Sequence, residues 1–230
     1  MKKGIKKMKI NYFDFGLYKG VELSWITREV LPSLGVKEYS AYGFEACKKY
    51  ADNVSADFLD LENVKINNVA ISDKEGTTKL YYSPNNLGHS IFSTKNNVIQ
   101  EEYEEVETIR FSKWIKDNEI DLENSFNIVK VNIEGAEWHL FNDLVNSDMI
   151  KHIDVWCGAG HDVEKVEELH SVVDKYYKLL KSNNIKILRY TEYMPYKNVD
   201  IRKIIFLKYM MKNYSANKKF NLSEDRIVWE

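Results

Sequence analysis

Two glycines follow the first predicted strand at a spacing that favours a ligand-binding turn. Residues 8–14 are rich in apolar and aromatic side chains and predict a strand, and Asp14, Gly16 and Gly20 come at its end. Glycine permits a tight turn and close packing of the next helix, whose N-terminus offers free N–H groups to an anionic group. The Gly-x-x-x-Gly spacing is not the G-x-G-x-x-G fingerprint of dinucleotide sites. The turn therefore predicts either a ligand loop of another kind or a plain tight turn.

A carboxylate ends the second predicted strand, which covers residues 39–44. This residue is Glu45, and it follows Gly20 by roughly the interval at which an acidic residue binds a ribose in comparable sheets. Such a carboxylate accepts hydrogen bonds from both ribose hydroxyls. The alternative is an exposed carboxylate that stabilises the positive end of the following helix.

Several side chains could remove a proton from a hydroxyl acceptor, which is the usual task of a general base. Glu134 directly follows the predicted strand 127–133, and His161 lies between a glycine-containing loop and a helix. Weaker candidates are His89 in the polar segment 84–100, and Glu137 and His139 on the helix after Glu134. No His-x-x-x-His or Cys-x-x-Cys pair occurs, so we expect no metal site.

The elements that position these residues alternate between strands and helices. Strands are predicted at 8–14, 39–44, 64–71, 105–111, 127–133, 151–157, 187–190 and 201–210, and helices at about 47–61, from 135 and at 162–182. This alternation indicates a doubly wound, mostly parallel α/β sheet. Ligands bind such sheets beyond the carboxyl ends of the strands, which is where the residues above lie.

Composition excludes several classes of protein. The 230 residues carry 33 Lys and Arg against 35 Asp and Glu, a formal net charge of −2, which gives no overall attraction to nucleic acid or anionic membranes. No run of apolar residues is long enough to span a bilayer, and the basic N-terminus has no apolar core behind it. The two cysteines, Cys47 and Cys157, cannot build a disulfide framework. We expect one domain over 1–230, with its core at about 8–211, in the cytoplasm.

Four sequence blocks together resemble the FkbM family of methyltransferases. They are Phe13-Asp14-Phe15-Gly16 with Gly20, Gly43-Phe44-Glu45-Ala46, the stretch 68–76 (NVAISDKEG) followed by TTKLYYS, and the stretch 129–137 (VKVNIEGAE). The last block is the most specific, and the resemblance runs from about residue 10 to about 210. It implies a Rossmann-like class I methyltransferase fold, with a doubly wound, mostly parallel seven-stranded sheet whose last strand is antiparallel.

The resemblance also implies a cofactor, S-adenosylmethionine, and the residues that bind it. Its methionine portion would be held by the loop that contains Asp14, Gly16, Leu17, Tyr18 and Gly20. Glu45, with Ala46 beside it, would bind the ribose. Ala70 and Ile71 would border the adenine. Asn132 and Glu134 would face the sulfonium and the acceptor. Glu134 and His161 are the predicted catalytic residues.

The chain departs from the family pattern at three places. Leu17 and Tyr18 replace a small residue and an asparagine, and the region around His161 matches only loosely. Asn132 stands where the family usually has aspartate, and an amide can form a hydrogen bond but cannot act as a base. Asn132 and Glu134 also lie at alternate positions, which predicts that they share one side of an extended strand end and that Ile133 faces the opposite layer.

The predicted function is transfer of a methyl group from S-adenosylmethionine to a hydroxyl oxygen of a sugar or other small-molecule acceptor. One alternative is methylation of RNA, which the basic chain ends favour weakly. The other is an inactive S-adenosylmethionine-binding module, which Asn132 suggests. Acceptor choice is expected to depend on segments 84–100 and 191–200; no membrane partner is expected, and the oligomeric state stays open.

Overall fold

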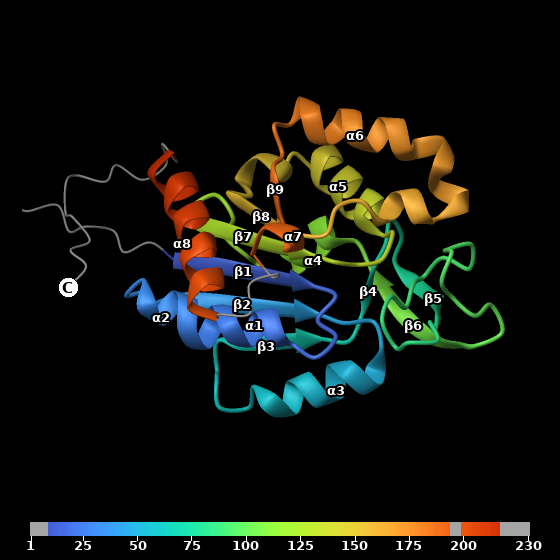
Figure 1. The fold of residues 1–230 in the computed structure, drawn as a ribbon, viewed down its shortest axis with the longest axis horizontal. Helices are drawn as coiled ribbons and strands as arrows, with labels where there is room; N and C mark the ends of the chain where they lie inside the picture. The colour runs from blue at the N-terminus through green and yellow to red at the C-terminus, as the bar shows by residue number, and fades with distance from the viewer. Residues whose placement is uncertain (1–8, 194–198, 217–230) are drawn as a thin grey trace, which may run out of the picture.

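A central parallel sheet organises the computed structural model, which describes residues 9–193 and 199–216. Its strands follow the order β3-β2-β1-β7-β8-β9, and every neighbouring pair is parallel (Figure 1). They are β1 (Lys9–Phe15), β2 (Tyr39–Phe44), β3 (Val64–Asn67), β7 (Ser125–Val131), β8 (Val155–Gly158) and β9 (Ile187–Arg189). The central strands β1 and β7 are buried on both faces, which explains their nearly continuous apolar sequences.

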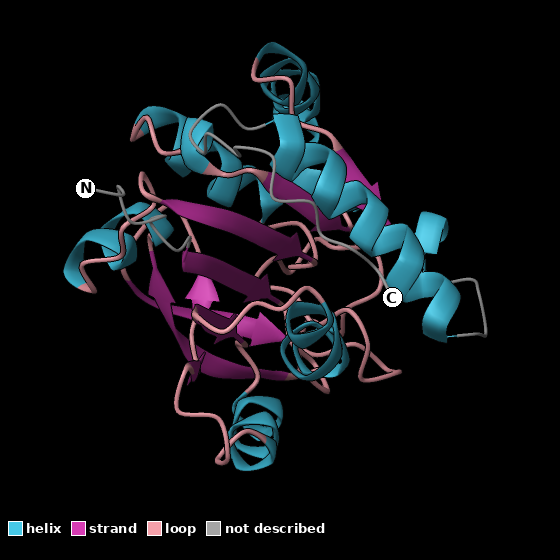
Figure 2. Ribbon diagram, turned by 90° about the vertical axis from the view of Figure 1, so that its left-hand side faces the viewer, coloured by secondary structure: helices cyan, strands magenta, loops and turns pink. Residues whose placement is uncertain are grey.

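Helices cover both faces of this sheet (Figures 1 and 2). One face packs against α1 (Val21–Trp25), the π-helical turn Ile26–Val30, α2 (Leu31–Ser33), α3 (Lys48–Asp57) and α8 (Val199–Ala216). The other packs against α4 (Phe111–Asp117), α5 (Glu137–Asn146) and α6 (Val173–Ser182). Along β1, Tyr12 points to the first layer and Phe13 and Phe15 to the second, as the two-residue period of a strand requires.

A second, smaller sheet lies beyond the carboxyl ends of the main strands (Figure 1). It has the order β4-β6-β5, with β4 (Ala70–Ile71), β5 (Gly76–Tyr81) and β6 (Tyr103–Ile109). The pair β5–β6 is antiparallel and the pair β4–β6 is parallel. The segment between β5 and β6 returns across the end of the main sheet.

The predicted α/β class with a mostly parallel sheet is confirmed, but the last strand is wrong. The main sheet has six strands among the described residues, and 201–210 lies inside helix α8. Phe206 and Met210 are both buried and stand four residues apart, which is the helical period. A short apolar run fits a buried strand equally well, so the sequence alone did not distinguish the two.

Three other boundaries also differ from the sequence prediction. The predicted strand 64–71 is two strands in different sheets, β3 and β4. The predicted strand 151–157 begins only at Val155, after a 3-10 turn, Ile150–His152. The predicted helix 162–182 is α-helical only from Val173, after two 3-10 turns, Asp162–Lys165 and Glu167–Val172.

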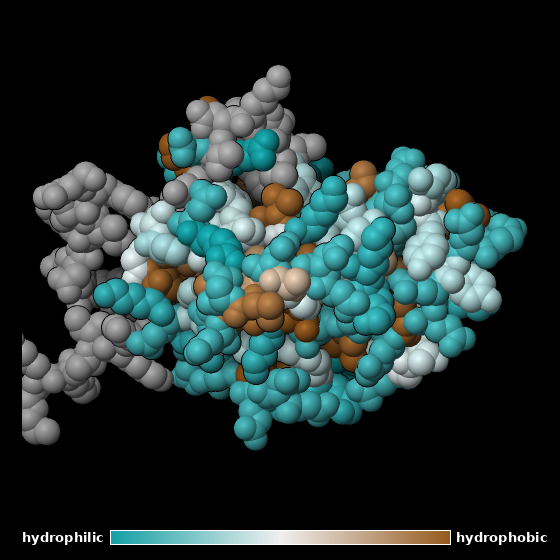
Figure 3. Space-filling model, turned by 90° about the horizontal axis from the view of Figure 1, so that it is seen from below, coloured by the Kyte–Doolittle hydropathy of each residue, from teal (hydrophilic) through white to brown (hydrophobic). Residues whose placement is uncertain are grey.

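The surface on the side of α3 is mainly hydrophilic, with hydrophobic residues gathered near its middle (Figure 3). Leu59, just after α3, is the most exposed of the large apolar side chains that the structure describes, at 85%. Within 9–193 and 199–216, no helix combines the length and apolar character that crossing a bilayer demands. The short helix α7 (Tyr190–Tyr193) follows β9, and the predicted acceptor segment 191–200 lies in part outside the described residues.

Candidate functional site

A pocket of about 290 Å³ lies where the main sheet faces the smaller sheet. Its walls come from the loops after β1, β2 and β7, from β4 and β5, and from the segment between β5 and β6. The lining residues are Gly16, Tyr18, Phe44, Glu45, Ala46, Tyr50, Val69, Ala70, Ile71, Leu80, Asn86, Leu87, Gly88, His89, Ile91, Asn132, Ile133, Glu134 and Ala136. This is the end of a parallel sheet at which α/β proteins bind ligands.

Gly16 lets the loop after β1 pass close to the loop after β7. It has a φ of +80°, and a Cβ atom there would lie 1.9 Å from the carbonyl oxygen of Asn132. The end of β1 is hydrogen-bonded to both neighbouring strands. Gly16 N–H donates to Phe44 O of β2, and Asn132 N–H, just after β7, donates to Phe15 O. A side chain at position 16 would therefore separate two walls of the pocket.

Glu45 is held in the pocket wall by two backbone N–H groups. Its Oε2 accepts from Tyr18 N at 2.8 Å and its Oε1 accepts from Cys47 N at 2.9 Å. Burial raises the pKa of Glu45, and these two hydrogen bonds oppose that rise. Only 9% of the residue is exposed, so it is not the exposed carboxylate of the alternative prediction, although it does bond the N-terminus of α3. Each carboxylate oxygen keeps a lone pair that can accept from a hydroxyl.

An apolar slot adjoins Glu45. It is formed by side chains from both sheets: Ala46, Val69, Ala70, Ile71 and Leu80. Tyr18 and Tyr50 close one end, with their rings edge to face at a centroid distance of 4.8 Å. A flat aromatic group fits a slot of this composition, with polar groups at one end to orient it.

Glu134 lies on the pocket wall, on a strained turn. Its φ is +56° and that of Gly135 is +111°, so the chain leaves the extended conformation after β7. Glu137 holds this turn, because its carboxylate accepts from Ile133 N at 3.1 Å and from Gly135 N at 2.7 Å. Ile133 lines the pocket together with Asn132 and Glu134, and it also packs against the buried core.

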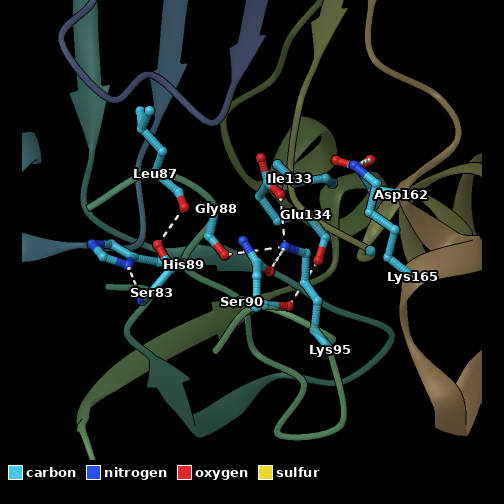
Figure 4. A network of polar contacts seen from close by, with 12 residues as sticks. Ser83, Leu87, Gly88, His89, Ser90, Lys95, Ile133, Glu134, Asp162 and Lys165 are labelled. Atoms are coloured by element: carbon cyan, nitrogen blue, oxygen red, sulfur yellow. Dashed lines mark hydrogen bonds and ion pairs between the residues drawn. The ribbon is translucent and has the colours of Figure 1, made fainter. Parts of the chain in front are cut away.

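The segment 84–100 forms part of the pocket wall and contacts Glu134 (Figure 4). Ser90 Oγ donates to Glu134 O at 2.7 Å, and Lys95 Nζ lies 3.0 Å from Glu134 Oε2. His89 lines the pocket, and its Nδ1 accepts from Ser83 N at 2.9 Å. Burial and the nearby Lys95 lower the pKa of His89, which favours the neutral imidazole.

Eight of the twelve predicted site residues line the pocket. They are Gly16, Tyr18, Glu45, Ala46, Ala70, Ile71, Asn132 and Glu134. They come from all four sequence blocks of the resemblance, which the fold brings to one place.

The other four predicted residues lie elsewhere. Asp14 is buried beneath the loop, where Tyr12 Oη donates to it and Lys130 Nζ lies 2.9 Å from its Oδ1. The Leu17 side chain packs in the core against Gly43. These positions favour support of the loop over contact with a ligand.

Gly20 and His161 are also not on the pocket wall. Gly20 has a φ of +65° and packs the start of α1 against Val54 of α3, beside a different cavity of about 540 Å³. That cavity is larger, but it contains only Gly20 of the predicted site residues. The imidazole of His161 is half exposed, and its Nε2 lies 3.7 Å from Asp162 Oδ1.

Sequence reasoning missed two lysines that contact the predicted site residues. Lys95 is in a polar segment without periodicity, and Lys130 occurs inside a buried strand. The available signal was the charge of Lys130 in a predicted strand, since buried lysines are almost always paired. Over the described ranges, no group of three or more His, Cys, Asp or Glu side chains is arranged to hold a metal ion.

Comparison with known proteins identifies the family. No curated protein matches the sequence. Among solved structures, the chain is similar to the crystal structure of methyltransferase FkbM from Methylobacillus flagellatus KT, with 12% identity and a TM-score of 0.36. The match covers 64% of this chain and 32% of that one, so the chain spans about a third of the length of that structure. The family model described as methyltransferase FkbM domain matches residues 14–157, more than half of the chain, and the chain therefore belongs to that family.

Proposed function

We propose that this protein transfers a methyl group from S-adenosylmethionine to a hydroxyl oxygen of a sugar or another small molecule. The observation that carries the proposal is the meeting of three loops on one pocket: Gly16–Tyr18, Glu45–Ala46 and Asn132–Glu134. These loops follow three adjacent strands, β2, β1 and β7. Family membership supports methyl transfer, and the pocket supports the choice of cofactor and acceptor.

The pocket residues fit the chemical groups of this cofactor. The Glu45 carboxylate suits the ribose hydroxyls, and the slot of Ala46, Val69, Ala70 and Ile71 suits the adenine. The charged side chains on the wall are two carboxylates, Glu45 and Glu134, and Lys95, which pairs with Glu134, is not on the wall, so the described residues of the wall present no cation that would repel a sulfonium. When bound, the cofactor supplies a methyl carbon that a hydroxyl oxygen can attack.

The residues of the chain have separate tasks in this reaction. The strained turn at Glu134 and Gly135 places a carboxylate on the pocket wall beside segment 84–100. Glu134 would accept the proton that the acceptor hydroxyl loses when its oxygen takes the methyl group. Burial raises the pKa of Glu134, which makes its carboxylate a stronger base. The side-chain amide of Asn132 would form a neutral hydrogen bond with the cofactor or the acceptor.

The charges on the pocket wall also affect which acceptor can bind. Two carboxylates on the wall favour an uncharged hydroxyl compound over the polyanionic backbone of RNA. An inactive binding module would hold the cofactor but transfer nothing. These alternatives give different outcomes in one set of measurements.

The test begins with calorimetry of S-adenosylhomocysteine and NAD binding to the whole chain. We expect binding of the first and none of the second. Methyl-labelled S-adenosylmethionine is then incubated with pooled sugars, small alcohols and RNA, with Glu134→Gln as the matched control. Label in the sugar or alcohol fraction, lost in the control, supports the proposal. Label in RNA alone contradicts the acceptor, and cofactor binding without any transfer indicates the inactive module.

A further inference from the structure

Lys95 places a buried ammonium group against Glu134 (Figure 4). Its side chain is 1% exposed, and Nζ lies 3.0 Å from Glu134 Oε2. The same nitrogen donates to Gly88 O at 3.2 Å and to Asn97 Oδ1. An ammonium group has three N–H donors, so these three acceptors satisfy it completely. Lys95 therefore has no donor left for a ligand, and its effect must act through Glu134.

The backbone around Lys95 is fixed on its other side. Lys95 pairs with Val166 in an isolated β-bridge, and Asn96 N–H donates to Lys165 O at 3.1 Å. Segment 84–100 is thus attached to the turn Asp162–Lys165, and Ser90 attaches it to the main chain of Glu134. Lys95 adds a contact to the Glu134 side chain, so segment 84–100 bonds both the main chain and the side chain of Glu134.

We propose that Lys95 is a positioning residue, which fixes the Glu134 carboxylate in its charged form and fastens segment 88–97 over it. This inference rests on the proposed function, because it concerns the base of that reaction. It adds a residue outside all four sequence blocks of the family resemblance.

The charges around Glu134 explain why the contact matters. Asp162 and Lys165 face it from the turn after β8, Glu137 faces it from α5, and Lys95 faces it from segment 84–100. Burial and Asp162 raise the pKa of Glu134, whereas Lys95 and Lys165 lower it. Without Lys95, a buried carboxylate would remain beside two others, and protonation would remove its ability to accept a proton.

The main experiment replaces the ammonium by a side chain of similar length, Lys95→Met. The pKa of Glu134 is followed by NMR with carboxyl-labelled glutamate, and the signal is assigned by its absence in Glu134→Gln. We expect Lys95→Met to raise this pKa by about one unit or more. The matched control is Lys165→Met, which removes a nearby positive charge that bonds Asp162 and not Glu134, and its shift should be smaller. An equal or smaller shift in Lys95→Met would overturn the proposal.

A second measurement does not depend on the folding of Lys95→Met. In Glu134→Gln, the amides of residues 88–97 should exchange with solvent about tenfold faster or more than in the wild type, because the ion pair is lost. Amides of α4 serve as the internal reference. Unchanged exchange in 88–97 would also overturn the proposal. Failure of the wild type to bind S-adenosylhomocysteine would instead contradict the proposed function, so the two failures are distinguishable.

Once an acceptor is identified, enzyme kinetics can show whether Lys95 positions the Glu134 carboxylate or only stabilises the fold. Lys95→Met should lower kcat while the affinity for S-adenosylhomocysteine stays within about twofold, since Lys95 is not on the pocket wall. The acidic limb of its pH profile should move to higher pH. A uniform loss of affinity with an unchanged pH profile would show that Lys95 is structural only.

Discussion

Replacing Lys130 by methionine should separate the stability of the fold from the shape of the cofactor loop. Lys130 Nζ lies 2.9 Å from Asp14 Oδ1 and donates to Gly16 O at 2.6 Å. Both side chains of the ion pair are at most 2% exposed. Burial opposes both charges and raises the pKa of Asp14, but the nearby Asp14 carboxylate raises the pKa of Lys130 well above its usual value, and the 2.9 Å contact is that of an ion pair.

Within the part of the chain that the structure describes, Lys130→Met leaves the buried Asp14 carboxylate with the Tyr12 hydroxyl as its hydrogen-bond donor. Breaking one side of a buried ion pair costs about 3–5 kcal/mol. For a chain of this length, that corresponds to a fall in Tm of about 6–20 °C. Urea unfolding followed by tryptophan fluorescence measures the free energy, and calorimetry measures the Tm.

The double variant, Asp14→Leu with Lys130→Met, tests the cause. Most of the lost stability should return, because an apolar pair of similar size avoids the unpaired buried charge. The affinity for S-adenosylhomocysteine should stay weakened, because Gly16 O has still lost its donor. A Lys130→Met variant that loses less than about 1 kcal/mol would refute the ion-pair argument. A double variant that binds normally would show that the pair does not shape the loop.

Three other changes probe two residues of the pocket wall and the carboxyl group of Glu137 beneath the turn after β7. Glu45→Gln should weaken S-adenosylhomocysteine binding by about 1–3 kcal/mol in calorimetry, with an unchanged circular dichroism spectrum, because the charged acceptor is lost; unchanged affinity would place the ribose elsewhere. Glu134→Gln should lower turnover on an identified acceptor by about 10²-fold or more while cofactor affinity changes little, and full activity would mean that Glu134 only supports the turn. Burial, followed by the charge of Asp162, raises the pKa of Glu137 to about 8, so its protonated form contributes stability at low pH that is lost as pH rises from about 4.5 through about 8. Urea midpoints should therefore fall less between pH 5 and 8.5 in Glu137→Gln than in the wild type, and parallel pH profiles would contradict the assignment.

The part of the fold that could be predicted is the part that local sequence determines. The strands β1, β2 and β7 have nearly continuous apolar sequences because both of their faces are buried, and their loops carry the glycines and carboxylates of the pocket. Helix α8 could not be distinguished from a strand, since its apolar residues form a short run without strict alternation.

The side of the pocket formed by segment 84–100 could not be predicted in detail. Its contacts join residues 44 positions apart, such as Ser90 and Glu134, and no local pattern reports such a pair. Asn132 and Glu134 both line the pocket, as the alternation argument expected, but the positive φ at Glu134 is not part of a regular strand and could not be predicted from alternation. The sequence contains Gly135, but it does not reveal that Glu134, the residue before it, adopts a positive φ.

The short connection between β3 and β4 determines how the pocket can diverge. Only Asn68 and Val69 separate these strands, which belong to different sheets, and Asn68 Nδ2 donates to the carbonyls of Glu45 and Ala46. The strands β1, β2 and β3 and the Glu45 wall therefore precede the smaller sheet in the chain, and Asn68 ties that wall to the start of β4. Insertions or exchanges in the stretch between β5 and β6 leave the register of the main strands untouched, because that stretch pairs with none of them. Under the proposed function, natural drift or deliberate grafting in this stretch that keeps Ser90 and Lys95 would change acceptor choice while the loops after β1 and β2 stay the same.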